Sequence, residues 1–140
     1  MTLNQGTGMN ENTQALRSSR DLRVYQHGYA VALRIYNLSK TWPRDERYAL
    51  TDQVRRSSRS VCANLAEAWA QRAYPRHFVS KLSDALGEAE ETRTWIDFAH
   101  DCGYVSIDEH EAMTGALRNV IGGLTLMMAR PAPWCRPAIP

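Results

Sequence analysis

The stretch DQVRRSSRSVCANLAEAW, residues 52–69, places three arginines within five positions and contains neither glycine nor proline. At about 100° per residue of a helix, its apolar positions gather in one arc: Val54, Val61, Leu65 and Ala68. The arginines gather in the opposite arc: Arg55, Arg56 and Arg59. The stretch therefore predicts a helix that buries a small apolar face and presents a basic stripe on its surface.

Helical periodicity of three and four extends over four segments, separated by breaks at residues 42–43, 74–75 and 102–104. In residues 21–41 the repeating side chains are Leu22, Tyr25, Tyr29, Leu33 and Tyr36. In residues 44–73 they are Leu50, Val54, Ser58, Val61, Leu65 and Ala68. The third segment repeats Phe78, Leu82, Ala85, Ala89, Ile96 and Ala99, and residues 106–130 repeat Met113, Leu117, Val120, Ile121, Leu124 and Met128. Four amphipathic helices joined by short turns predict an all-α fold, an antiparallel up-down four-helix bundle.

Two pairs of residues have the spacing of a capping box, in which two side chains satisfy free backbone N–H groups at a helix start. Ser18 and Asp21 are expected to cap the first helix, and Ser106 and Glu109 the fourth.

The composition is typical of a single globular domain, with 140 residues, 44% of them hydrophobic and 23% charged. No window approaches the roughly 18 apolar residues of a membrane span, and no signal sequence is recognisable, so we expect a cytoplasmic protein. We expect a disordered N-terminal segment at residues 1–19, the bundle at 20–130 and a proline-rich tail at 131–140. Three widely spaced cysteines predict reduced thiols: Cys62, Cys102 and Cys135.

Charge is distributed unevenly along the chain. Residues 1–82 carry thirteen basic against six acidic side chains, whereas residues 83–140 carry four against nine. Arg44 and Arg47 precede the basic stripe, and Arg72 and Arg76 follow it, so the second helix and its ends are predicted to form a continuous positive ridge. Such a ridge favours phosphate contacts, which give salt-sensitive binding with little sequence preference. A solvated helix face with local pairs such as Asp52 with Arg56 is the alternative.

Two blocks of residues also carry a family resemblance. The first block contains Pro43, Glu46, Arg47, Leu50, Thr51, Gln53, Arg55, Arg56, Ala63, Asn64, Ala66 and Glu67. The second contains Phe78, Leu82, Ala85, Leu86, Gly87, Glu91, Thr94, Gly103 and Tyr104. Over about residues 21–128 the chain resembles the ribosomal RNA intervening-sequence family of small bacterial four-helix bundles, relatives of the accessory protein of diversity-generating retroelements.

The resemblance implies a homopentameric ring, a basic surface that binds RNA or DNA with weak sequence preference, and no known catalysis or cofactor. For the retroelement relatives it also implies a reverse-transcriptase partner. The chain departs from the family pattern at Cys62, where proline is usual, at Ala68, where glycine is usual, and at Glu88, where serine is common. Because alanine favours a helix over glycine by roughly 1 kcal/mol, the second helix should be more continuous here.

Other polar residues are better explained by packing than by catalysis. Asn64, Glu67 and Glu91 lie at the flanks of their helices, where interhelical hydrogen bonds or pairing with arginine are expected. Metal-binding bundles use paired Glu-x-x-His motifs, and only Asp97 with His100 has a comparable spacing, so we expect no metal site. The remaining candidate ligands are expected to be surface or packing residues: His77, His110 and Cys102.

An enzymatic alternative is a helical ribonuclease with an Arg-x4-6-His motif, in which imidazole deprotonates a ribose hydroxyl beside a guanidinium. Three pairs have that spacing: Arg72 with His77, Arg93 with His100, and Arg20 with His27. With seventeen basic residues and four histidines such pairs arise by chance, so we do not expect an enzyme.

A structural oligomer without nucleic acid is the other alternative. Four tryptophans and six tyrosines supply more aromatic surface than a small core readily encloses, and aromatic residues are enriched at interfaces. The tail RPAPWCRPAIP cannot be helical and would either dock on a partner or be disordered. The preferred prediction is a non-catalytic, oligomeric nucleic-acid-binding module.

Overall fold

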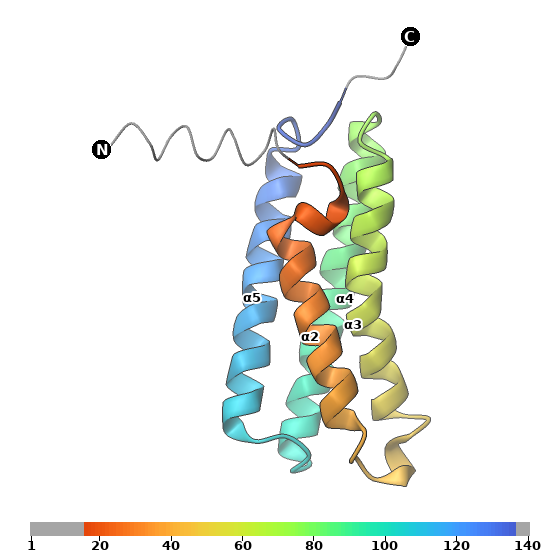
Figure 1. Cartoon of the computed structure of the whole chain (residues 1–140), viewed down its shortest axis with the longest axis vertical. Helices are drawn as coiled ribbons and strands as arrows, with labels where there is room; N and C mark the ends of the chain where they lie inside the picture. The colour runs from red at the N-terminus through yellow and green to blue at the C-terminus, as the bar shows by residue number, and fades with distance from the viewer. Residues whose placement is uncertain (1–15, 137–140) are drawn as a thin grey trace, which may run out of the picture.

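A computed structural model describes residues 16–136 of the chain, and within them four long helices form an up-down bundle (Figure 1). The helices are α2 (Arg23–Ser39), α3 (Leu50–Ala70), α4 (Pro75–Asp101) and α5 (Ile107–Ala129). Two short 3-10 helices, η1 (Ser19–Asp21) and η2 (Arg44–Glu46), precede α2 and α3. Each helix packs against its neighbour in sequence, and α5 closes the ring against α2. The predicted four-helix bundle is confirmed, and residues 16–136 contain no strand.

The predicted capping boxes both form, although one of them caps a different element. At the start of α5 the Ser106 hydroxyl accepts from Glu109 N at 3.1 Å, and Glu109 Oε1 accepts from Ser106 N at 3.0 Å. The box of Ser18 and Asp21 caps η1, and α2 begins only after Leu22, whose backbone is extended. Most of the predicted disordered segment, residues 1–15, and the last four residues of the predicted tail lie outside the described residues.

The second helix is shorter than residues 44–73, the range that periodicity predicts. Residues 44–49 form η2 and a turn, since no side chain among them is apolar enough and suitably placed to be buried against the bundle. At the other end α3 ends at Ala70, and a turn leads to Tyr74, which Pro75 sterically excludes from the helical region. Pro75 then occupies the first turn of α4, where its missing N–H costs nothing.

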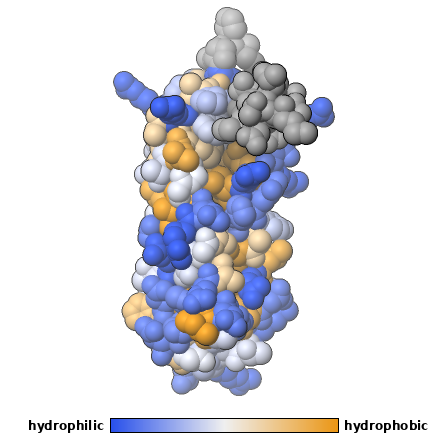
Figure 2. All heavy atoms as spheres, turned by 90° about the vertical axis from the view of Figure 1, so that its left-hand side faces the viewer, coloured by the Kyte–Doolittle hydropathy of each residue, from blue (hydrophilic) through white to orange (hydrophobic). Residues whose placement is uncertain are grey.

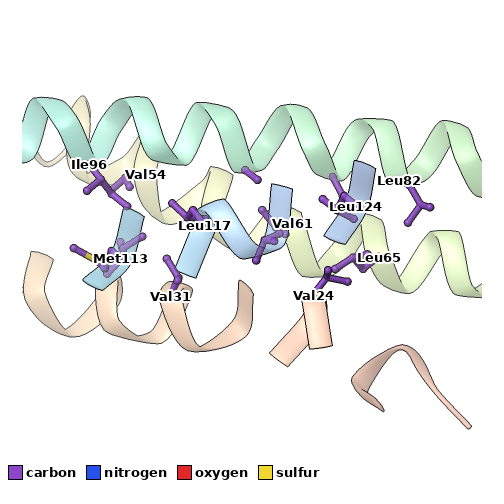
Figure 3. Packing of buried hydrophobic residues seen from close by; sticks show 14 of the residues in the cluster. Val24, Val31, Val54, Val61, Leu65, Leu82, Ile96, Met113, Leu117 and Leu124 are labelled. Carbon is purple, nitrogen blue, oxygen red and sulfur yellow. The ribbon is translucent and has the colours of Figure 1, made fainter. Parts of the chain in front are cut away.

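The core confirms the predicted faces of α3 and α4. All six predicted positions on each of these helices are buried, and side chains from all four helices meet along the bundle axis (Figure 3). On α5 the buried face is shifted slightly, since Met127 is buried while Ile121 and Met128 are only partly buried.

The predicted face of the first segment is wrong over most of α2: Leu22 is buried and Tyr25 partly buried as predicted, but the other three positions are on the surface. Tyr29 and Leu33 are each 50% exposed and Tyr36 is 38% exposed. The buried side of α2 is the adjacent stripe of smaller residues: Val24, Gly28, Val31 and Ile35. The reason is close packing, because a Cβ added at Gly28 would lie only 3.2 Å from Val61 Cγ1 of α3. Small and β-branched residues fit this narrow space and tyrosine rings do not, so the aromatic stripe is left on the surface.

Two consecutive glycines of α5 provide a test of this close packing. A Cβ at Gly123 would lie 2.5 Å from Val24 Cγ1 of α2, whereas a Cβ at Gly122 meets nothing within 4 Å. We expect Gly122→Ala to raise the free energy of unfolding by about 0.5–1 kcal/mol, through helix propensity alone. Gly123→Ala should lower it by about 1–2 kcal/mol, since overpacking against the stiff Val24 side chain outweighs the propensity gain. Urea unfolding at one fixed protein concentration measures both, and equal effects of the two variants would contradict the packing of α2 on α5.

Candidate nucleic-acid interface

Three positive side chains converge on one tyrosine ring near the C-terminal end of α2. Lys40 Nζ lies 4.7 Å from the centroid of the Tyr36 ring, Arg55 Cζ lies 5.0 Å from it and Arg59 Cζ 5.7 Å. These distances are in the range of cation–π contacts. We refer to Tyr36, Lys40, Arg55 and Arg59 as the Tyr36 cation cluster.

The end of α2 holds Arg55 in place within this cluster. Arg55 Nε donates to the hydroxyl of buried Ser39 at 2.8 Å, and Arg55 Nη2 donates to the Tyr36 carbonyl at 3.4 Å. Lys40 is the C-cap residue of the same helix. The last carbonyls of a helix carry partial negative charge that favours cations. The C-terminal carbonyls of α2 therefore favour the positive side chains that α3 places at this end.

A groove of about 530 Å³ runs beside the cluster between α2 and α3. The α2 wall is the exposed aromatic stripe, and the α3 side is formed largely by small residues: Tyr25, Tyr29, Ala32, Leu33 and Tyr36 face Arg59, Cys62, Ala63 and Ala66. The Tyr25 and Tyr29 rings stack with centroids 6.0 Å apart. Burial raises the pKa of the Cys62 thiol to about 11, so this thiol is uncharged at neutral pH and does not offset the nearby cations.

No described acidic side chain forms an ion pair with the cations of the cluster. Residues 22–44 contain four basic residues and no acidic one. The ion pairs that α3 makes within residues 16–136 reach across to α4: Arg56 with Glu91 at 3.1 Å and Glu88 at 3.7 Å, and Glu67 with Lys81 at 2.7 Å. The positive charge of the cluster is therefore not neutralised by described neighbours.

The seven predicted arginines do not lie on one ridge. Arg55 and Arg59 meet at Tyr36, whereas Arg56 points toward α4. Arg44 and Arg47 are exposed on the connection between α2 and α3, which begins beside Lys40. Arg72 lies over the Trp69 ring at the far end of α3, and Arg76 is exposed in the first turn of α4. With 1.5 Å of rise per residue, α3 separates its two ends by about 30 Å.

Sequence reasoning missed two members of the cluster. Helical periodicity places Tyr36 on the buried face of the first helix and gives no reason to single out Lys40. The absence of acidic residues from 22 to 44 is the sequence signal that points to them.

The flanking polar residues play mainly the packing roles that the sequence predicts. Glu91 accepts from Arg56 Nη2 through both carboxylate oxygens at 3.1 Å, and Glu67 pairs with Lys81 of α4. Burial and the neighbouring Glu91 raise the pKa of Glu88, an effect that Arg56 opposes. Asn64 instead donates to the Ser60 carbonyl of its own helix.

His110, one of the residues expected on the surface or in packing, lies beside a second histidine. The His100 and His110 rings lie 4.7 Å apart, and His110 Nε2 lies 2.8 Å from Asp97 Oδ1. Within residues 16–136, however, no three His, Cys, Asp or Glu side chains are arranged to hold a metal ion. Arg72 and His77, one of the pairs with the spacing of the helical ribonuclease motif, contact different aromatic rings. His77 packs against Tyr74, and Arg72 lies over Trp69.

Three further observations describe the rest of the molecule. On the face that carries α5, hydrophobic residues are interspersed with hydrophilic ones (Figure 2). None of the described helices is both long enough and apolar enough to cross a membrane. Cys62, Cys102 and Cys135 form no disulfide with one another.

The chain is similar to one known protein family and to a solved structure. Residues 20–125 match the family described as 23S rRNA-intervening sequence protein. A crystal structure of a protein with unknown function from the S23 ribosomal protein family of Bacteroides thetaiotaomicron VPI-5482 superimposes with a TM-score of 0.68 at 26% identity. The match covers 76% of this chain and 95% of that one, and no curated protein matches. The chain therefore belongs to the 23S rRNA-intervening sequence protein family.

Proposed function

We propose that this protein is a non-catalytic nucleic-acid-binding protein that contacts phosphates through the α2–α3 face. The observation that carries the proposal is the convergence of Lys40, Arg55 and Arg59 on Tyr36 without an ion pair to any described carboxylate. Three like charges held this close repel one another. A phosphate backbone relieves that repulsion and releases its own counterions.

The neighbouring residues extend this surface in two directions. Arg44 and Arg47 continue the positive charge along the connection that follows Lys40. On the other side lies the groove, where Tyr25 and Tyr29 offer exposed or partly exposed rings. Bases of a single strand stack on such rings without sequence preference. Arg56, Arg72 and Arg76 lie outside this surface and have no part in the proposal.

The names of the relatives favour RNA over DNA as the ligand. The family is named for an intervening sequence of 23S rRNA, and the structural neighbour belongs to a family named for a ribosomal protein. Ribosomal RNA offers both phosphate-dense helices and unstacked loops. A surface with cations beside tyrosines suits such a mixture of duplex and single strand.

The experiment that tests this function measures binding of the purified protein to labelled structured RNA and to duplex DNA over a salt series. We expect binding that is tight at low salt, with an observed affinity constant that falls steeply as salt rises. Absence of binding at low salt would indicate that the cations of the Tyr36 cation cluster contact another protein instead of a nucleic acid. The non-nucleic-acid oligomer would then be the better account.

We also propose the homopentameric ring that the family resemblance implies. Phe98 and Ile107, on α4 and α5, are exposed apolar side chains of the kind that oligomers cover, and they support assembly without specifying its order. Light scattering at micromolar concentration is expected to give five times the 15.9 kDa of one chain. A mass equal to one chain would contradict assembly, and a different multiple would contradict the pentamer.

A further inference from the structure

A second basic and aromatic site lies at the opposite end of α3. Residues 131–136 fold back over this end of the bundle, next to η1 (Figure 1, top). Arg136 N donates to the Arg72 carbonyl at 3.0 Å, and Trp134 N donates to the Pro131 carbonyl at 3.0 Å. A half-open pocket of about 250 Å³ lies between this segment and the end of α3. Its lining includes Leu16, Trp69, Arg72, Trp134, Cys135 and Arg136.

The lining of this pocket is positive and contains no acidic side chain. Burial and the nearby Arg136 lower the pKa of Arg72, which means that its positive charge is poorly compensated. Burial raises the pKa of the Cys135 thiol, so this thiol is uncharged at neutral pH and adds no negative charge. An anion bound between Arg72 and Arg136 would remove their mutual repulsion.

Trp69 holds the Arg72 guanidinium in place. Its Cζ lies 3.6 Å from the centroid of the Trp69 ring, and its Nε donates to the Trp69 carbonyl at 3.0 Å. Within residues 16–136 its two terminal nitrogens have no hydrogen-bond acceptor. Those nitrogens form the part of the guanidinium that binds phosphate with two parallel hydrogen bonds.

We propose that this pocket binds a phosphate monoester attached to a planar aromatic base, as in a purine nucleoside monophosphate. The phosphate lies between Arg72 and Arg136, and the base stacks on Trp134 or on the guanidinium of Arg72. A phosphate monoester carries a charge of about −1.5 to −2 at pH 7, which matches two guanidinium groups. The ligand is either a free nucleotide or the phosphorylated end of a strand.

The size and the position of the pocket restrict the ligand. The pocket of about 250 Å³ is smaller than the roughly 300–1,000 Å³ of sites that enclose drug-sized ligands, and it is open to solvent on one side, so a bound nucleotide is only partly enclosed. Arg72 lies thirteen residues beyond Arg59 on the same chain, or about 20 Å along a helix. The pocket is therefore separate from the Tyr36 cation cluster, and this proposal does not rest on the proposed function.

Calorimetric titration of the full-length protein with AMP, adenosine and inorganic phosphate tests the proposal. We expect AMP to bind, and adenosine and phosphate each to bind at least about tenfold more weakly, since each makes only half of the contacts. Arg72→Gln and Arg136→Gln should each weaken AMP binding about tenfold or more. Arg118→Gln changes an exposed arginine of α5 that does not line the pocket, and it should bind AMP as the wild type does.

Short strands that differ only in a 5′-phosphate or a 5′-hydroxyl distinguish the two sources of the ligand. If AMP binds, the site accepts free nucleotides. If AMP does not bind, but the phosphorylated strand binds more tightly than the hydroxyl strand and Arg136→Gln abolishes that difference, the ligand is a strand end. The proposal is overturned if neither AMP nor the phosphorylated strand distinguishes the wild type from the Arg72 and Arg136 variants. Circular dichroism of each variant confirms that the helices are retained, and Arg136→Gln alters a side chain of the C-terminal segment outside the bundle core.

Discussion

Replacing Lys40, Arg55 and Arg59 together with glutamine is expected to weaken RNA and duplex DNA binding on the order of 10- to 100-fold at low salt. Exposed ionic contacts are worth up to about 1 kcal/mol each, so three of them account for this range. The slope of log affinity against log salt should become shallower by about 0.9 for each phosphate that is no longer neutralised, or nearly 3 in all, for duplex DNA. Fluorescence anisotropy over a salt series measures both quantities.

A second triple variant controls for the loss of net charge. Arg93, Arg118 and Arg130 lie on α4, on α5 and at the end of α5, outside the α2–α3 face. Their replacement with glutamine removes the same three charges and is expected to change affinity much less. An equal loss of affinity in both triple variants would show that overall charge drives binding, and the Tyr36 cation cluster would then have no special role.

Leu65→Ala is expected to lower the free energy of unfolding by about 2–5 kcal/mol. Leu65 is 0% exposed, and removing its side chain costs both hydrophobic transfer energy and a cavity at the centre of the bundle. At about 3–6 °C for each kcal/mol in a domain of this size, the melting temperature should fall by about 6–30 °C. Thermal unfolding followed by circular dichroism measures this shift.

Leu126→Ala supplies the matched control for this prediction. The same substitution removes the same atoms from a side chain of α5 that is 71% exposed, so we expect a change within about 0.5 kcal/mol. A large loss at Leu126 would show that this surface is covered in solution, for instance by another subunit. A small loss at Leu65 would contradict its central place in the core.

The faces of α3 and α4 were predictable because each helix has a single apolar stripe. Apart from Cys62 and Trp69, the rest of the α3 surface is polar or consists of alanine, so periodicity leaves one choice for the buried side. The first helix has two adjacent stripes with helical spacing, one aromatic and one β-branched, and periodicity does not rank them. The choice depended on the distance between helices, which Gly28 and Gly123 shorten beyond what tyrosine rings permit.

The candidate site was only partly predictable for a related reason. Helical angles within α3 predict the arginine stripe. Which neighbouring helix each arginine contacts depended on the positions of α2 and α4. Arg56 reaches the acidic residues of α4, whereas Arg55 reaches the end of α2. Periodicity places the aromatic wall of the groove in the core, so it predicts neither the groove nor the Tyr36 cation cluster.

The number of helices, the buried faces of α3 and α4, the capping box of α5 and the family all follow from the order of residues alone. These features depend on residues within one helix turn of each other, or on the succession of residue types along the chain, and therefore need no knowledge of distances between helices. Packing in three dimensions selected which side of α2 is buried, which cations meet at Tyr36, and how the segment at residues 131–136 forms a pocket with α3. Those contacts join residues far apart in sequence, and the volume available between packed helices selects them.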